Sequence, residues 1–301
     1  MRDIHLHLSG ATPPEILWEI VRESGFKTGS KNYWHFAQNI TMDRTKVKDL
    51  DSYLQVLHAI EEAQSSPLAV QESVYSAYRA SYMYGCTYME LRWNCVKRSQ
   101  KGRIDLDSLI VAARAGYERA KMIYGIEGGM ILCLGRDCSE EENAALFKKA
   151  IQYNDKGIIG LDIAGPEHNS IPKEFVHYYK AANASKMITT CHVGETDHNK
   201  VEDEIAFVLE KLQPQRIGHG VQIVKYPKLL KKAASMGIHF EICISSNLVT
   251  RAVADLQEFR DIFRTFENNG INFSINTDAL FPLGTNIKKE NELFQQIKEL
   301  A

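Results

Sequence analysis

Apolar and polar side chains alternate over the first positions of the chain, in the order Ile4, His5, Leu6, His7, Leu8 and Ser9. Successive side chains of a β-strand point to opposite faces, so this period of two predicts a strand with His5 and His7 on one face. Two imidazoles on one face can bind one metal ion, but an isolated H-x-H motif more often lies on a solvent-exposed edge strand. Gly10 follows at the expected strand end, where a ligand could approach the backbone closely.

Seven further short apolar segments have the character of buried strands. They cover residues 88–93, 130–134, 158–163, 187–192, 216–218, 239–244 and 272–276. The amphipathic segments between them predict helices at 105–124, 140–154, 173–185, 200–212, 228–236 and 254–268. Further helices are expected at about 13–24, 51–63, 68–84 and from 287 to the end. Residues 25–48 are expected to form a loop with a short helix, which is a candidate lid.

The alternation of eight strands with helices predicts an α/β protein of the TIM (β/α)8 barrel type. We expect one barrel domain that covers residues 1–301. A doubly wound open sheet is the structural alternative. The chain contains neither G-x-G-x-x-G nor G-x-x-x-x-G-K-[ST], which argues against the nucleotide-binding versions of such sheets.

Composition and charge narrow the classes of partner. The chain is 44% hydrophobic and 25% charged, and its formal net charge is -2, so no basic surface for nucleic acid is expected. No apolar run approaches the roughly 18 residues of a membrane-spanning helix. The six cysteines show no C-x-x-C spacing, which predicts free thiols in the reducing cytoplasm and no disulfide framework.

Polar side chains gather at the predicted strand ends. In a TIM barrel the carboxyl ends of the strands surround the active site, so these side chains are expected to converge on one mouth. Each of them alone has a plain structural explanation, such as a core histidine, a turn residue, a helix cap or a solvated charge. Together they predict a metal or catalytic site. The candidates are His5, His7, Gly165, His192, Glu195, His219 and Asp278.

Seven motifs resemble those of the adenosine deaminase family of the amidohydrolase superfamily, and they occur in that family's order. They are I-H-L-H-L-S-G-A at 4–11, Y-M-E-L-R-W at 88–93, L-D-I-A-G-P-E at 161–167, H-V-G-E at 192–195, R-I-G-H-G at 216–220, C-I-S-S-N-L at 243–248 and S-I-N-T-D at 274–278. The resemblance implies a metal-dependent hydrolase barrel that deaminates a 6-aminopurine nucleoside or nucleotide and releases ammonia. The implied metal is one Zn²⁺, bound by His5, His7, His192 and Asp278.

The resemblance also implies roles for the remaining candidates. Glu195 protonates the purine ring nitrogen N1, and His219 orients the attacking water and stabilises the charge that develops. Asp278 also accepts a proton from that water. Gly165 presents its backbone N–H to ring nitrogen N3. A single metal is expected because Ala164 and Gly165 stand where relatives with two metals usually carry a carboxylated lysine.

Two departures from the family pattern concern the substrate. Ala279 stands where the family usually has a second aspartate that binds purine N7, and Ser9 stands where an aspartate usually meets the ribose 5′-hydroxyl. Loss of that negative charge makes a 5′-phosphate easier to admit, so nucleoside and nucleotide substrates both stay open. Candidate phosphate partners in the possible lid are Lys27, Lys31 and Arg44.

The chain ends earlier than members of the family usually do, so the family's C-terminal helices are expected to be missing. The alternative that the sequence is a fragment of a larger protein is also left open. Oligomerisation and fusion to a regulatory domain stay open as well. The functional alternative is a non-catalytic purine-binding regulatory domain that kept the deaminase fold. Hydrolysis of an ester or amide would fit the metal site but not Glu195 and Gly165 together. A zinc site of the cytidine deaminase type is excluded because the chain lacks P-C-x-x-C.

Overall fold

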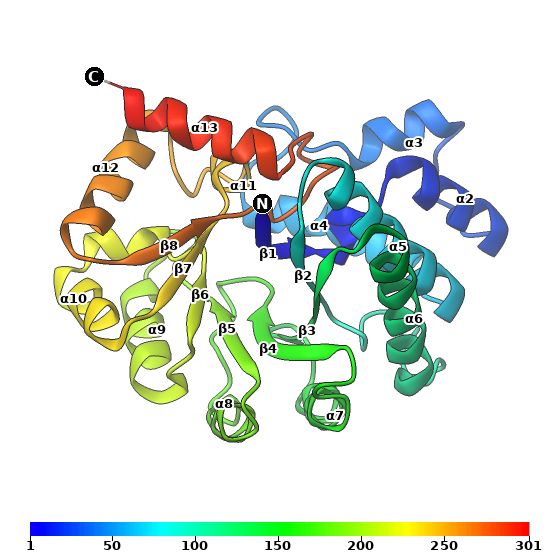
Figure 1. Ribbon diagram of the computed structural model, residues 1–301, viewed down its shortest axis with the longest axis horizontal. Helices are drawn as coiled ribbons and strands as arrows, with labels where there is room; N and C mark the ends of the chain where they lie inside the picture. Colours follow the sequence, from blue (N-terminus) through cyan, green and yellow to red (C-terminus); the bar gives the residue numbers. More distant parts are fainter. Residues whose placement is uncertain (301) are drawn as a thin grey trace.

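A computed structural model describes residues 1–300 and contains one eight-stranded parallel sheet (Figure 1). Each strand pairs with the next in chain order. The strands are β1 (Arg2–His7), β2 (Tyr88–Trp93), β3 (Glu127–Gly135), β4 (Ile158–Ala164), β5 (Ile188–His192), β6 (Arg216–Gly218), β7 (His239–Ile242) and β8 (Asn272–Ile275). All eight predicted strands are confirmed, and the sheet curls into a nearly closed TIM barrel.

The barrel closes between β1 and the residues that follow β8. The backbone N–H of His7 donates to the carbonyl of Asp278 at 2.9 Å, and the N–H of Asp278 donates to the carbonyl of His5 at 2.8 Å. The side chain of Asn276 also accepts from the N–H of Ile4 at 3.0 Å. These bonds bring the two ends of the sequence to the same point of the barrel.

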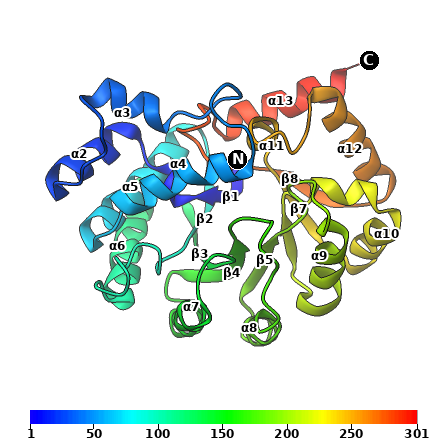
Figure 2. The ribbon, with the colours of Figure 1, turned by 180° about the vertical axis from the view of Figure 1, so that it is seen from behind.

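Helices surround the sheet on its outer face (Figure 2). They are α2 (Pro14–Ser24), α3 (Tyr33–Ile40), α4 (Leu50–Ala63), α5 (Pro67–Met83), α6 (Leu106–Tyr124), α7 (Glu140–Gln152), α8 (Phe175–Ala184), α9 (Val201–Phe207), α10 (Pro227–Met236), α12 (Leu256–Asn268) and α13 (Ile287–Glu299). The short helix expected within residues 25–48 is α3. The helix expected over 200–212 is divided into α9 and a π-helical turn, Val208–Leu212. Among residues 1–300, none of the helices combines the length and the apolar character that crossing a bilayer requires.

Two predicted strands run two residues past the end of the observed strand. β1 ends at His7, and the next residues form a helical turn, α1 (Leu8–Ala11). The turn is tight because Gly10 packs against the segment after β8: a Cβ on Gly10 would lie 2.3 Å from the Cβ of Ala279. Ser9 therefore does not continue the face of the strand that carries the two histidines. The strand predicted at 239–244 likewise ends at Ile242, and another turn, α11 (Ile244–Val249), follows.

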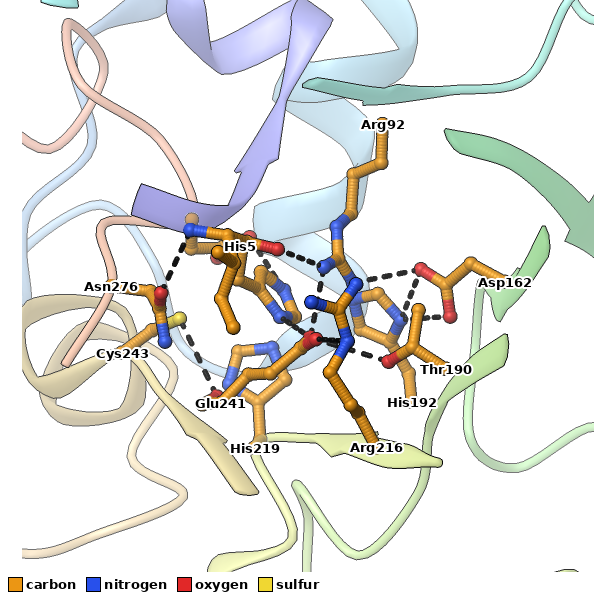
Figure 3. A network of polar contacts seen from close by, with 12 residues as sticks. His5, Arg92, Asp162, Thr190, His192, Arg216, His219, Glu241, Cys243 and Asn276 are labelled. Carbon is orange, nitrogen blue, oxygen red and sulfur yellow. Dashed lines mark hydrogen bonds and ion pairs between the residues drawn. The ribbon is translucent and has the colours of Figure 1, made fainter. Parts of the chain in front are cut away.

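The interior of the barrel is buried but contains charges. Arg92 of β2 is fully buried and forms ion pairs with Asp162 at 2.9 Å and Glu241 at 2.8 Å. Arg216 pairs with Glu241 at 2.8 Å and also with Glu90. These residues project inward from four strands and form one connected network, which Figure 3 shows in part. The ion pairs offset much of the free energy lost when these charges are removed from water, whereas an unpaired buried charge would strongly destabilise the fold.

Replacing Arg92 with Met is expected to leave the buried carboxylate of Asp162 without its arginine partner and Glu241 with Arg216 alone. The free energy of unfolding, measured by urea denaturation, should fall by about 3–5 kcal/mol. The matched control is Arg114→Met, because Arg114 pairs with Glu118 at 2.6 Å where both side chains are about half exposed. That variant should lose no more than about 1 kcal/mol. Equal losses in the two variants would contradict the role of the buried network.

Candidate active site and metal centre

Three histidines and one aspartate meet at the carboxyl ends of the strands. The Nε2 atoms of His7 and His192 lie 3.1 Å apart. The Oδ1 atom of Asp278 lies 3.7 Å from Nε2 of His5 and 3.5 Å from Nε2 of His7. His5, His7 and His192 each offer a ring nitrogen within 4.8 Å of the others, which is a grouping that could hold a metal ion.

The protonation of these rings fits a metal. Burial lowers the pKa of His5 well below its usual value and lowers the pKa of His7 to about 3, so both rings are neutral. Nδ1 of His5 lies 2.8 Å from Glu241, and Nδ1 of His192 lies 3.0 Å from the carbonyl of Ile163. With the protons on Nδ1, each Nε2 keeps a lone pair for a ligand. Nε2 of His5 is buried and has no hydrogen-bond partner within residues 1–300.

A second grouping overlaps the first and consists of His5, His219 and Cys243. Burial raises the pKa of Cys243 well above its usual value. The thiol is therefore protonated, and a metal prefers the thiolate. The three histidines with Asp278 are the better donor set, and nitrogen and oxygen donors of this kind are those that zinc takes.

Acidic residues beneath the rings hold their orientation (Figure 3). Glu241 contacts His5, and Asp162 contacts His192 through a 3.1 Å approach of Oδ2 to Nδ1. Arg92 bridges the two carboxylates. Carboxylates that accept from the far nitrogen of a ligating histidine are a regular feature of metal sites. These residues were not predicted, although charges inside otherwise apolar strands were the signal in the sequence that could have found them.

Asp278 is constrained by its backbone and by two hydroxyl groups. Its φ of +61° lies in the left-handed region, which a residue other than glycine seldom adopts. Its Oδ2 accepts hydrogen bonds from Tyr53 at 2.7 Å and from Ser246 at 2.6 Å. Burial would raise the pKa of Asp278, but neighbouring imidazoles and these two bonds outweigh it and hold the pKa below the usual value. The side chain is an anion at neutral pH.

Glu195 follows β5 and lies beside His219, with its Oε2 3.7 Å from Nε2 of that ring. Burial first, and then the nearby Glu167 and Asp278, raise the pKa of Glu195 well above its usual value. A proton donor that works at neutral pH needs a raised pKa, and here burial is the main cause. Glu167 also accepts hydrogen bonds from the backbone N–H groups of Glu195 and Thr196, at 3.1 and 2.7 Å, and so fixes this loop.

His219 is held on its other side by Asn247. The side-chain amide of Asn247 lies 3.0 Å from Nδ1 of His219. His219 itself has a φ of +57° directly after β6, which turns its ring toward the mouth of the barrel. Nε2 of His219 therefore faces the same space as the carboxyl group of Glu195.

A pocket of about 680 Å³, which includes space open to solvent, lies above these groups. The predicted residues that line it are His7, Ser9, Gly165, His192, Glu195, His219 and Asp278, while His5 lies beneath them. Helix α4 supplies one wall through Leu50, Tyr53, Leu54 and Leu57. The candidates from the strand ends thus lie around one mouth of the barrel.

The charged residues at the outer end of the pocket were not predicted. Nζ of Lys97 lies 2.8 Å from Asp137 and 3.1 Å from Nε2 of His58, and both Lys97 and His58 line the pocket. The three cations proposed for phosphate do not line it. Lys27 lines a separate cavity between α2, α3 and α4, and Arg44 donates to a surface carbonyl. The position of Lys97 just after β2 was the available signal.

The family model described as "Adenosine deaminase" matches residues 1–300. The adenosine deaminase of Vibrio vulnificus (strain YJ016) is 26% identical over 277 residues, which are 92% of this chain and 81% of that protein. A similar solved structure is a cog1816 amidohydrolase from Burkholderia ambifaria with bound Zn, which is 21% identical, has a TM-score of 0.86 and is matched over 99% of this chain and 80% of that one.

Arabidopsis ADAL complexed with IMP is also similar in structure. It is 21% identical, has a TM-score of 0.84 and is matched over 99% of this chain and 86% of that one. These solved structures share the fold, and the family model covers almost all of the sequence. The chain therefore belongs to the adenosine deaminase family of the amidohydrolase superfamily.

Proposed function

We propose that this protein is a zinc-dependent aminohydrolase that converts a 6-aminopurine nucleoside or nucleotide to the corresponding 6-oxopurine and ammonia. The observation that carries the proposal is a buried carboxyl group with a raised pKa, Glu195, in one pocket with His7 and His192 and above His5, where the imidazoles of His5 and His7 are neutral. His5, His7, His192 and Asp278 would hold the zinc ion, which when bound would supply a water molecule that ionises at neutral pH.

The side chains of the site donate and accept the protons of the reaction and orient the attacking water. Glu195 is protonated and donates its proton to ring nitrogen N1, which quenches the negative charge that develops on the ring. Asp278, an anion, accepts the proton of the attacking water. His219, held by Asn247, orients that water and stabilises the charge of the transition state.

The substrate is held at the carboxyl ends of β1 and β4. Gly165 has a φ of +116°, and a Cβ there would lie 3.2 Å from a carboxylate oxygen of Asp137, so glycine suits both the conformation and the close approach of a base. In this proposal the backbone N–H of Gly165 donates to ring nitrogen N3, and the side chain of Ser9 contacts the sugar. Ala279 is buried beside Gly10 and offers no partner for N7.

The relatives support a nucleotide or nucleoside substrate and a zinc ion, because one is described with IMP and another with Zn. All six cysteines are free thiols, five of them buried, which fits a reducing compartment such as the cytoplasm. The alternative function is a non-catalytic purine-binding regulatory domain. Ala279 favours it, because an unmade buried hydrogen bond weakens the hold on the base by about 1–3 kcal/mol.

We expect wild-type protein to act on at least one of six purines. It should release ammonia from adenosine, deoxyadenosine, AMP, dAMP or ATP, or methylamine from N6-methyl-AMP. Glu195→Gln keeps the size of the side chain but cannot donate a proton, so kcat should fall by about 10²–10⁴-fold. Glu118→Gln, on the exposed face of α6, is the matched control and should keep full activity. If wild type and Glu195→Gln are equally inert while purines still bind, the regulatory alternative is supported.

Removal of the metal is expected to abolish activity and lower stability. Dialysis against a chelator should eliminate ammonia release, and stoichiometric Zn²⁺ should restore it. Because the metal binds the folded state, zinc at about 100 times its dissociation constant should add about 2.7 kcal/mol to the free energy of unfolding. Unchanged activity and an unchanged thermal midpoint after metal removal, verified by elemental analysis, would contradict the zinc assignment.

A further inference from the structure

The two oxygens of the Asp278 carboxylate have different surroundings. Oδ2 accepts hydrogen bonds from two hydroxyl groups, those of Tyr53 and Ser246. Oδ1 faces the imidazoles of His5 and His7. Both lone-pair directions of Oδ2 are thereby occupied, and the carboxylate cannot turn this oxygen toward the imidazoles without losing two bonds.

We infer that Tyr53 is a positioning residue of the metal centre: with Ser246 it fixes Asp278 so that Oδ1 alone faces the imidazole cluster. The inference rests on the proposed function only in taking Asp278 as a metal ligand. Ser246 belongs to the barrel, in the turn that follows β7. Tyr53 comes from α4, outside the strands, so its phenol connects this helix directly to the metal centre.

The position of Tyr53 on α4 is well determined. The preceding turn holds a capping box, in which Asp49 accepts from the N–H of Ser52 at 2.9 Å and the Ser52 hydroxyl lies against the backbone of Asp49. Capping boxes fix the first turn of a helix. The ring of Tyr53 packs in a small apolar cluster with Met42, Val47, Leu50 and Leu57. The helix start and the ring contacts place the hydroxyl group within reach of Asp278 before any metal binds.

The same helix forms a wall of the substrate pocket through Leu50, Leu54, Leu57 and Tyr53 itself. A displacement of α4 that opened the pocket would therefore also withdraw the phenol from Asp278. The metal ligand is fully oriented only when this wall is in place. The proposed role of Tyr53 is exerted through Asp278, because its hydroxyl group donates to that carboxylate.

Tyr53→Phe tests the inference, because it removes the hydroxyl and keeps the ring in its apolar cluster. Loss of a group that orients a metal ligand typically costs about 10–100-fold in metal affinity or activity. We expect the apoprotein variant to bind Zn²⁺ about 10-fold more weakly in competition with a chromophoric chelator. The visible spectrum of the Co²⁺-loaded variant should differ from that of wild type, and kcat should fall while KM changes little.

Two controls separate this role from packing. Leu54→Ala shortens a side chain of the same helix and pocket that has no hydrogen-bonding group, so KM should rise while zinc affinity and the Co²⁺ spectrum stay as in wild type. Tyr75→Phe removes a phenol that lies outside the site and forms a 3.1 Å hydrogen bond with the hydroxyl group of Tyr124. This variant should change none of these measurements. The double variant Tyr53→Phe with Ser246→Ala should show non-additive losses, because both groups serve one oxygen.

An unchanged zinc affinity and Co²⁺ spectrum in Tyr53→Phe would overturn the inference, whether or not KM rises. This outcome is distinct from a failure of the proposed function. If wild type binds zinc but releases ammonia from no purine, the proposed function fails, and a weakened zinc affinity in Tyr53→Phe still supports the inference. Thermal unfolding of the apoproteins verifies that each variant is folded.

Discussion

The closure of the barrel between β1 and the chain that follows β8 is the contact on which the site depends. Two backbone hydrogen bonds join His7 and His5 to Asp278. In an open sheet the first and last strands would lie at opposite edges, and these side chains would be far apart. Closure makes them neighbours, and it places Asp278 in the left-handed conformation that turns its carboxylate toward the imidazoles.

Once closed, the barrel holds the metal-facing atoms from two sides. From within the barrel, Glu241 and Asp162 orient His5 and His192, and Arg92 neutralises both carboxylates. At the mouth of the barrel, the hydroxyl groups of Tyr53 and Ser246 donate hydrogen bonds to Oδ2 of Asp278. An arrangement built on strands and supported on both sides is more precise than one carried by loops. Burial first, and then the positive charge of Arg92, lower the pKa of His5 and keep its imidazole neutral.

Much of this architecture could be predicted from the sequence, because parallel buried strands are short apolar runs and their polar ends point to one mouth. What the sequence could not supply depends on contacts between distant segments. Ser9 was placed on a strand because its alternation is perfect, but the close approach of Gly10 to Ala279 forces a turn there. Tyr53 gave no signal, because an aromatic residue on an amphipathic helix has the pattern of an ordinary core residue. Lys97 lies at the pocket only because the loop after β2 folds back toward α4.

The wide separation of the metal-facing residues along the chain has a consequence for biosynthesis. His5 and His7 leave the ribosome among the first residues, whereas Asp278 is translated after all eight strands and after every described helix except α13. A nascent polypeptide therefore carries two imidazoles that have no carboxylate partner for nearly the whole of translation. The proposed metal site can therefore be complete only after Asp278 has been synthesised and the barrel has closed between β1 and the residues after β8.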